Sequence, residues 1–521
     1  MLFRYGNVPE RKGKRKRDGG WDPFLAGSFA YGSPTVEIDA QLPLSADKLG
    51  VAFGVALSHD EYSDGANGRA FSAAVIPRWR PADGIEVIPF WSMSTLKDEE
   101  VASTFTTAGA FVPTNLPRRR YFGQDWAQKD SRNDNFSLIS KVRLSDSWSI
   151  SAGLFRSISK SEENFYQDYL DDSTDGQARA EVTADPGNRS ASSSGEIRLT
   201  YGWGNGDRRH LVHAAVRARK VQSQYGGAAE PTDLGERKLG DKFPVPRPAS
   251  LEFGEQDRTE VRQMTLGLSY NGVWRNVGEL SLGLQKTDYD KRVDFPGTVP
   301  DTRAIDKPWL FNAALAIHAY TAIAVYGSYT CGLEESGTAP GNAANRNEAL
   351  PAIRTKQIDV GVRLSVAPGL RLLAGAFDIT KPYFSTDEDN IFTALGQVRH
   401  RGFEISMTAN PTKQVSIVAG AVVMDPKVTG EAVELGRVGR RPLGQEKVTF
   451  TGDVDYRLPW LDGASLDLSL TWTGRRPSSR DKVVSTDPYL NLDLGARYAF
   501  KLGNFPALLR LQLRNLTNSN G

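Results

Sequence analysis

Cysteine is almost absent from this chain of 521 residues, which holds only Cys331. A single cysteine excludes an internal disulfide and every zinc site built on paired cysteines. Long apolar runs are also missing, because no stretch of about 18 uninterrupted apolar residues occurs, and this excludes transmembrane helices. The mean hydropathy of −0.41 still permits a membrane β-barrel, since only alternate residues of each strand face lipid.

A large excess of one charge is lacking as well, because the formal net charge is only +2. Nothing in the overall charge therefore points to nucleic acid. The basic run RKGKRKR at 11–17 is the one local exception, and we interpret it as a solvated tail. The start of the chain has no apolar signal-peptide core. We assign residues 1–22 to a disordered basic linker, the remnant of a longer N-terminus, and residues 23–521 to the folded domain.

Several segments alternate strictly between apolar and polar side chains. The segment from Val448, VTFTGDVDYRL, places apolar side chains on one face and polar, mostly charged ones on the other. This two-residue period is typical of a β-strand. The same pattern occurs in segments 357–365, 403–408, 465–473, 490–500 and 509–514. At about 10 to 14 residues, such segments have the length that a tilted strand needs to cross a bilayer.

Short and long connections alternate along the chain. Tight turns are predicted at 45–47, 81–84, 145–147, 205–207, 271–272, 367–369, 410–412 and 503–504. Long polar connections are predicted at 96–132, 159–189, 223–257, 334–350, 425–445 and 474–487. One smooth rim and one elaborated rim are characteristic of bacterial outer-membrane barrels.

These patterns predict an all-β fold, a transmembrane antiparallel up-and-down β-barrel with short periplasmic turns and long extracellular loops. We count about 21 strands from Phe24 onward, close to the roughly 22 of large outer-membrane transporters. We expect one closing strand to be missing, which would leave an unpaired edge beside the first strand. Aromatic residues beside the turns, such as Trp148 and Trp274, are expected to form an interfacial girdle.

Four segments carry a resemblance to a known family. Segment 325–332 is followed by a polar loop and then by 350–361, in a strand–loop–strand pattern. Segment 396–404, GQVRHRGFE, has the form G-x-V-x-x-x-G-x-E. Segments 118–127 (RRRYFGQDWA) and 514–518 (RNLTN) add two further motifs. Together, and in their order along the chain, they resemble the TonB-dependent siderophore receptors.

The resemblance implies an outer-membrane receptor barrel for the uptake of a ferric siderophore. Its implied partners are outer-membrane lipid, the siderophore and, in a full-length form, the TonB complex. It implies a monomer with no enzymatic activity, no resident cofactor and no nucleic-acid partner. Receptors of this family carry an N-terminal plug inside the barrel, and nothing here matches it, so we expect a fragment without the plug and without the TonB box. The alternative is a passive, porin-like outer-membrane pore.

The predicted ligand-binding residues lie in the third and fourth extracellular loops. A ferric siderophore is bulky and often anionic, so aromatic rings and arginines would supply apolar contact, cation–π attraction and charge compensation. That mixture is concentrated at Arg118, Arg119, Arg120, Tyr121, Phe122 and Trp126, with Tyr166 and Tyr169 as further candidates. The same side chains could instead pack the loops on themselves, and both interpretations stay open.

No catalytic or metal-binding constellation is predicted. The five histidines are scattered, and His210 and His213, three apart on a strand, would point to opposite faces. The acidic pair Asp171–Asp172 is interpreted as solvated loop charge, although such carboxylates could bind Ca²⁺. A soluble β-propeller hydrolase is disfavoured, because the sequence has no internal repeat of roughly 40–50 residues.

Overall fold

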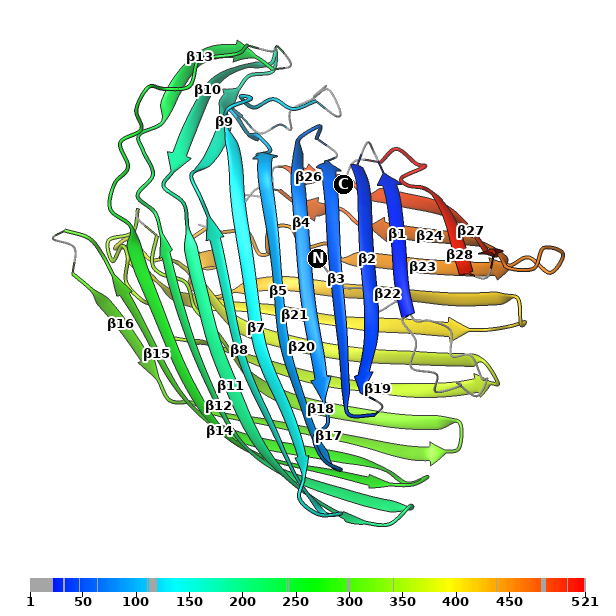
Figure 1. The fold of residues 1–521 in the computed structure, drawn as a ribbon. Helices are drawn as coiled ribbons and strands as arrows, with labels where there is room; N and C mark the ends of the chain where they lie inside the picture. The colour runs from blue at the N-terminus through cyan, green and yellow to red at the C-terminus, as the bar shows by residue number, and fades with distance from the viewer. Residues whose placement is uncertain are drawn as a thin grey trace.

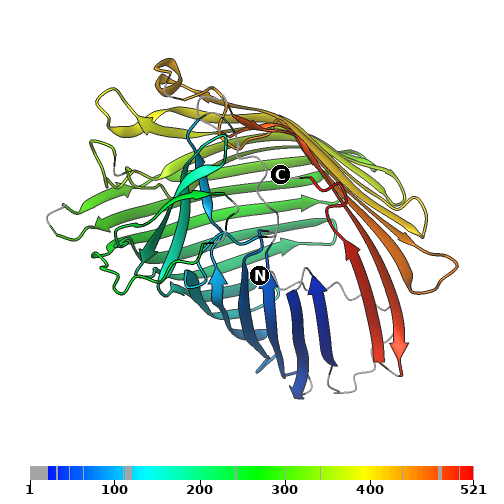
Figure 2. The same cartoon turned by 90° about the horizontal axis from the view of Figure 1, so that it is seen from above.

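The computed structural model describes residues 22–519 except 31–32, 46, 63, 110, 112–119, 240, 242, 298–299, 341, 437, 479–483 and 504. A single 22-stranded antiparallel sheet curls into the wall of a barrel (Figures 1 and 2). Its strands are β1 (Asp22–Ala30), β2 (Ser33–Ser45), β3 (Leu49–Glu61), β4 (Asn67–Trp79), β5 (Ile85–Glu100), β7 (Gln128–Arg143), β8 (Trp148–Ser161), β11 (Arg189–Gly204), β12 (Arg208–Tyr225), β14 (Asp257–Trp274), β15 (Gly278–Asp294), β16 (Thr302–Asp306), β17 (Trp309–Tyr320), β18 (Ile323–Glu334), β19 (Ile353–Ala367), β20 (Leu370–Thr386), β21 (Phe392–Ala409), β22 (Val415–Thr429), β23 (Val448–Arg457), β24 (Ala464–Thr473), β27 (Tyr489–Leu502) and β28 (Phe505–Leu513).

Each wall strand pairs with its neighbour in the chain, which is the up-and-down topology expected from the alternating connections. The short strand β16 and the longer β17 both pair with β15 and are separated only by Lys307 and Pro308. They therefore form one interrupted strand, so the 22 strands make 21 passes through the wall. Among the described residues no pairing joins β1 to β28, and Figure 2 shows these two strands facing each other across an opening.

The smooth rim has short turns at most of the predicted places, but the turn predicted at 271–272 is wrong. Asn271 and Gly272 lie inside β14, where Asn271 pairs with Leu211 on one side and Ser281 on the other. The chain reverses at 275–277 instead, where Asn276 takes the left-handed conformation (φ 60°). Asparagine tolerates that conformation better than most residues, so it still supplies the turn.

The outer face of the wall is apolar because it faces lipid. Cross-strand partners line up in rows, and one row runs Val360, Ala376, Phe403 and Val423 across β19 to β22. Their neighbours along each strand face the lumen, among them Asp359 and Glu404, and Phe403 is 70% exposed on the isolated chain. A row of this kind fits a bilayer, which would cover it.

Tight packing explains a glycine of the 396–404 motif. A Cβ atom placed on Gly402 would lie 2.6 Å from Phe377 Cζ and 2.6 Å from the Val423 carbonyl oxygen. Phe377 is the cross-strand partner of Gly402 and shares its lumen-facing side. Only glycine leaves room for this ring against the wall.

A second layer stands on the elaborated, extracellular rim. The four-stranded sheet of β6 (Thr104–Thr107), β9 (Asn164–Asp172), β10 (Gln177–Asp185) and β13 (Thr232–Lys238), here called the loop sheet, is built from three loops (Figure 1). The remaining elements are β25 (Arg476–Pro477), β26 (Ser485–Thr486) and the one-turn helix α1 (Glu431–Glu434). Among the described residues no helix is long and apolar enough to cross a membrane.

Candidate ligand-binding site

The predicted ligand-binding residues converge on the loop sheet. Arg118 and Arg119 lie outside the described residues. Arg120 to Trp126 lie in the third loop, between β6 and β7, whereas Tyr166 and Tyr169 lie on β9 in the fourth loop. The structure thus brings together side chains that are more than 40 residues apart in the sequence. A third segment, 243–251 of the fifth loop, completes the group.

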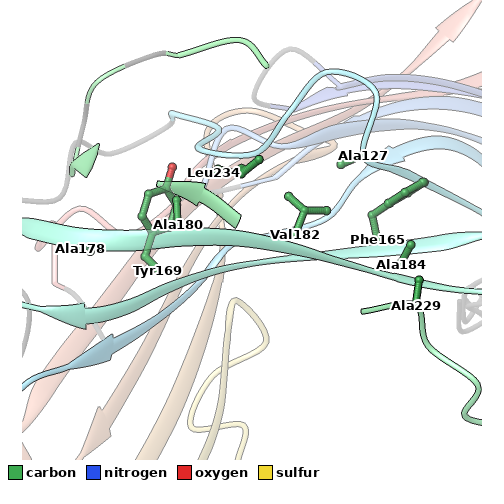
Figure 3. Close-up of a cluster of buried hydrophobic side chains, with 9 residues drawn as sticks. All are labelled: Ala127, Phe165, Tyr169, Ala178, Ala180, Val182, Ala184, Ala229 and Leu234. Atoms are coloured by element: carbon green, nitrogen blue, oxygen red, sulfur yellow. The ribbon is translucent and has the colours of Figure 1, made fainter. Parts of the chain in front are cut away.

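A shared apolar core holds the three loops together. Ala127, Phe165, Tyr169, Ala178, Ala180, Val182, Ala184, Ala229 and Leu234 are buried there (Figure 3). Phe105, Phe122 and Trp126 pack against this core. Alternate residues of β10, all small or branched, are buried, so one face of this strand packs into the cluster.

Aromatic contacts link the third and fourth loops. The ring of Tyr169 stacks on Phe105 with centroids 5.2 Å apart, and Phe122 meets Phe105 edge-on at 5.6 Å. Trp126 meets Phe165 edge-on at 5.4 Å. Offset-stacked and edge-to-face pairs are the favourable arrangements of aromatic rings. Phe122, Trp126 and Tyr169 therefore act in this structure as packing residues of the loop sheet.

Hydrogen bonds fix the polar ends of these rings. The Tyr169 hydroxyl donates to the Phe122 carbonyl oxygen at 3.0 Å, and the Gln167 side-chain amide donates to the same oxygen at 2.9 Å. The Trp126 indole N–H donates to the Val245 carbonyl oxygen at 2.7 Å. These bonds attach the third loop to the fourth and fifth loops at buried positions, where an unpaired polar group would be costly.

Exposure separates the candidates into two groups. Tyr169 is only 1% exposed, whereas Tyr166 on the same strand is 40% exposed. Arg120 and Tyr121 are half-buried at the edge of the cluster. Burial raises the pKa of the Tyr121 and Tyr169 phenols, so both stay protonated and can donate hydrogen bonds. Phe122 and Trp126 are also half-buried, but their rings pack against the apolar core. Arg120, Tyr121 and Tyr166 are thus the described candidates that are not part of that core.

Several residues of the site were missed by the sequence interpretation. The Gln124 side chain bonds the backbone of the fifth loop through both its oxygen, to Val245 N, and its nitrogen, to the Phe243 carbonyl. Arg237 lies over the Phe243 ring at 4.5 Å. The alternation of small apolar and polar residues in QARAEVTAD was the one available signal for β10, and it identifies a strand, not its partner.

The loop that connects β18 and β19 packs against the inner wall of the barrel. Lys291 on β15 is 3% exposed, and its Nζ donates to the carbonyl oxygens of Ser336 and Gly337, at 2.6 and 2.8 Å. Arg219 on β12 pairs with Glu335 at 3.4 Å. Loop 335–352 is therefore anchored to lumen-facing side chains of β15 and β12. Within the described residues no group of three His, Cys, Asp or Glu side chains could hold a metal ion.

Comparison with known proteins identifies the barrel. The family model "TonB dependent receptor-like, beta-barrel" matches residues 94–518. The ferrichrome receptor FcuA of Yersinia enterocolitica is 22% identical over 412 residues, which are 76% of this chain and 53% of that protein. The metal-pseudopaline receptor CntO of Pseudomonas aeruginosa strain UCBPP-PA14 is 21% identical over 418 residues, covering 75% and 57%. The chain thus spans little more than half the length of these curated relatives.

Solved structures agree in fold. The ferric preacinetobactin receptor BauA from Acinetobacter baumannii superposes with a TM-score of 0.79 at 18% identity, over 96% of this chain and 75% of that one. The siderophore receptor PiuA from the same species gives 0.80 at 15% identity, over 95% and 77%. Since the family model covers most of the sequence, the chain belongs to the TonB-dependent receptor-like β-barrel family, whose members are outer-membrane proteins of Gram-negative bacteria.

Proposed function

We propose that this chain is the barrel of an outer-membrane receptor that takes up a ferric siderophore. The family match over residues 94–518 carries the proposal, because this family consists of transport receptors. The two curated relatives named above are receptors for ferrichrome and for a metal-pseudopaline complex. Iron is then a transported substrate of the receptor, not a cofactor that stays bound to it. We further propose a monomer that depends on a TonB complex for release of the cargo in a full-length form.

The loop sheet supports binding at the extracellular mouth. Three loops are locked together by one apolar core and by backbone hydrogen bonds, which keeps the half-buried Arg120 and Tyr121 and the exposed Tyr166 in fixed positions. Preorganised side chains bind with less loss of conformational entropy than mobile ones. We assign ligand contact to Arg120, Tyr121 and Tyr166, together with Arg118 and Arg119. Phe122, Trp126 and Tyr169 support them.

Binding by the purified chain in detergent tests this assignment. Ferrichrome and a ferric catecholate complex are titrated while intrinsic tryptophan fluorescence is recorded. We expect saturable quenching by one of the two complexes, and Tyr166→Ala should weaken that binding about tenfold through the lost aromatic contact. Phe403→Leu, on the lipid-facing side, is the matched aromatic control and should bind as the wild type does.

A pore would behave differently in the same preparation. If neither complex quenches the fluorescence and the chain conducts small ions freely in a planar bilayer, the receptor proposal fails in favour of a passive pore. If a complex binds but Tyr166→Ala binds it unchanged, the receptor proposal stands and the assignment of Tyr166 is wrong.

A further inference from the structure

A band of charged side chains lies directly above the apolar band on the outer face of β19 to β22. The apolar row Val360, Ala376, Phe403 and Val423 is followed, one outward-facing position nearer the extracellular rim, by Ile358, Asp378, Arg401 and Asp425. The next outward row is Lys356, Thr380, Arg399 and Lys427. Strand register thus places two rows that carry most of the charged side chains on the outer face, directly on the extracellular side of the apolar row.

Ion pairs preorganise this band but do not neutralise it. Asp378 accepts from Arg399 Nε and from Arg401 Nε, each at 2.8 Å. Asp425 pairs with Lys427 at 2.6 Å and with Lys447 at 3.6 Å. Lys356 forms no ion pair with any described residue. Lys356, Arg399, Arg401, Lys427 and Lys447 are here called the basic belt. Within the described part of the chain they form ion pairs with two carboxylates, Asp378 and Asp425, which leaves an excess of three positive charges.

A neighbouring face of the barrel, separated from the basic belt by β17 and β18, provides a contrast within the same molecule. A cavity of about 460 Å³ on the outer face of β14 to β16 is lined by Arg262, Arg292 and Arg303. Four carboxylates line the same cavity: Glu260, Asp290, Asp294 and Asp301. Arg303 makes a two-point contact with Asp290, at 2.8 Å for both bonds. This face therefore has no positive excess.

We propose that the basic belt binds the phosphorylated headgroup of an outer-leaflet glycolipid. The belt lies where the headgroups begin, since the row beneath it is wholly apolar. Lysine and arginine near an anionic membrane surface each strengthen attachment, and the arginine fork matches phosphate oxygens. Long basic side chains can also bury their methylene stems in the lipid while their charges reach the headgroups. The proposal rests on the membrane location and is independent of the transported cargo.

In the 396–404 motif, the residues that face the lumen are separate from those that face outward. Val398, Gly402 and Glu404 occupy lumen-facing positions, whereas Arg399 and Arg401 occupy the alternate positions between them, on the outer face. The outward positions of this strand are thus available for lipid without disturbing the residues that face the lumen. The strand therefore carries two separate surfaces.

Lipid binding by the purified full chain in detergent micelles tests the proposal. The probes are bis-phosphorylated lipid A, the same lipid A without its phosphates, and inorganic phosphate, with native mass spectrometry as the readout. The triple variant Lys356→Gln, Arg399→Gln and Lys427→Gln should bind bis-phosphorylated lipid A about a hundredfold more weakly, because each basic residue contributes about fivefold. Dephosphorylated lipid A should bind wild type as weakly as the phosphorylated lipid binds the variant.

Two further variants serve as controls. Arg262→Gln, Arg292→Gln and Arg303→Gln on the balanced face should change binding by less than about threefold. The charge-conserving set Lys356→Arg, Arg399→Lys and Lys427→Arg should keep most of the affinity, which separates lost charge from misfolding. Equal loss in the balanced-face variant, unchanged binding in the first triple variant, or displacement of lipid A by inorganic phosphate at comparable concentration would each overturn the proposal.

Discussion

Replacing Tyr169 with alanine should open the loop sheet while leaving the barrel wall folded. Tyr169 is 1% exposed and stacks on Phe105 at 5.2 Å. Truncating a buried aromatic side chain to alanine costs about 3–5 kcal/mol. About 4 kcal/mol corresponds to an increase on the order of a thousandfold in the opening equilibrium, and amide exchange of β9 and β10 should accelerate by that factor. The wall strands, which do not depend on this ring, should keep their protection.

The conservative variant Tyr169→Phe refines the expectation. It removes only the hydroxyl that donates to the Phe122 carbonyl oxygen, and that oxygen still accepts from the Gln167 side-chain amide. The carbonyl is therefore not left unsatisfied, so the cost should be about 1 kcal/mol, or about fivefold in exchange. The ratio of the exchange rates of Tyr169→Ala and Tyr169→Phe then reports how much of the stabilisation comes from apolar packing of the ring.

Hydrogen–deuterium exchange with mass spectrometry, at peptides covering β9 and β10, is the assay. Tyr166→Ala, three residues away and 40% exposed, is the matched control and should leave exchange of both strands almost unchanged. Unchanged exchange in Tyr169→Ala would refute the argument that this ring holds the loops together. If siderophore binding were lost without faster exchange, Tyr169 would have to be a direct ligand contact.

Two further expectations concern buried charge. Asp172, interpreted from the sequence as a solvated loop charge, is instead buried, with 2% of its surface exposed. Its Oδ1 has no hydrogen-bond partner among the described residues, and burial raises its pKa, so the folded loop sheet binds this proton more tightly than the unfolded chain does. The carboxylate therefore destabilises the sheet once the pH exceeds the ordinary carboxyl range. Asp172→Asn should slow amide exchange in β9 and β10 at pH 7, and this difference should disappear as the pH falls through the carboxyl range. Equal exchange of variant and wild type at pH 7 would contradict this expectation. Lys291→Met removes two charged hydrogen bonds to loop 335–352 and should accelerate amide exchange of that loop about tenfold or more. Arg219→Gln breaks a partly exposed ion pair and should change the exchange less than about fivefold. Equal effects of the two variants would show that the lysine does not anchor the loop.

The architecture of the wall was predictable because lipid and the polar lumen impose a two-residue period on several of its strands. Lipid on one side and the polar lumen on the other make the alternation in 357–365 and 465–473 unambiguous, and both segments are strands. The turn at 275–277 was not predictable from Asn271–Gly272, because the ladder on both sides of β14 continues past this favourable turn sequence. Cross-strand pairing overrides local turn preference there.

The candidate site was only partly predictable, because its contacts connect distant loops. The sequence identifies the aromatic and basic mixture at Arg120 to Trp126, but whether Trp126 packs or binds depends on Val245, 119 residues away. No local pattern carries that information. The loop sheet itself escaped prediction, since alternating alanines in β10 give only a weak apolar signal.

The loop sheet has a consequence for the order of assembly. Its strand pairs join Thr104 to Asp168 and Gln177 to Lys238, roughly 60 residues apart in each case, and closing such long stretches of free chain is entropically unfavourable. Pairing of β7, β8, β11 and β12 shortens those distances by drawing the three loops to one sector of the rim. The sheet should therefore form late, after its sector of the wall is in place. An ordered loop sheet would then mark a fully assembled barrel, and antibodies against the loop sheet should recognise the inserted barrel but not its assembly intermediates.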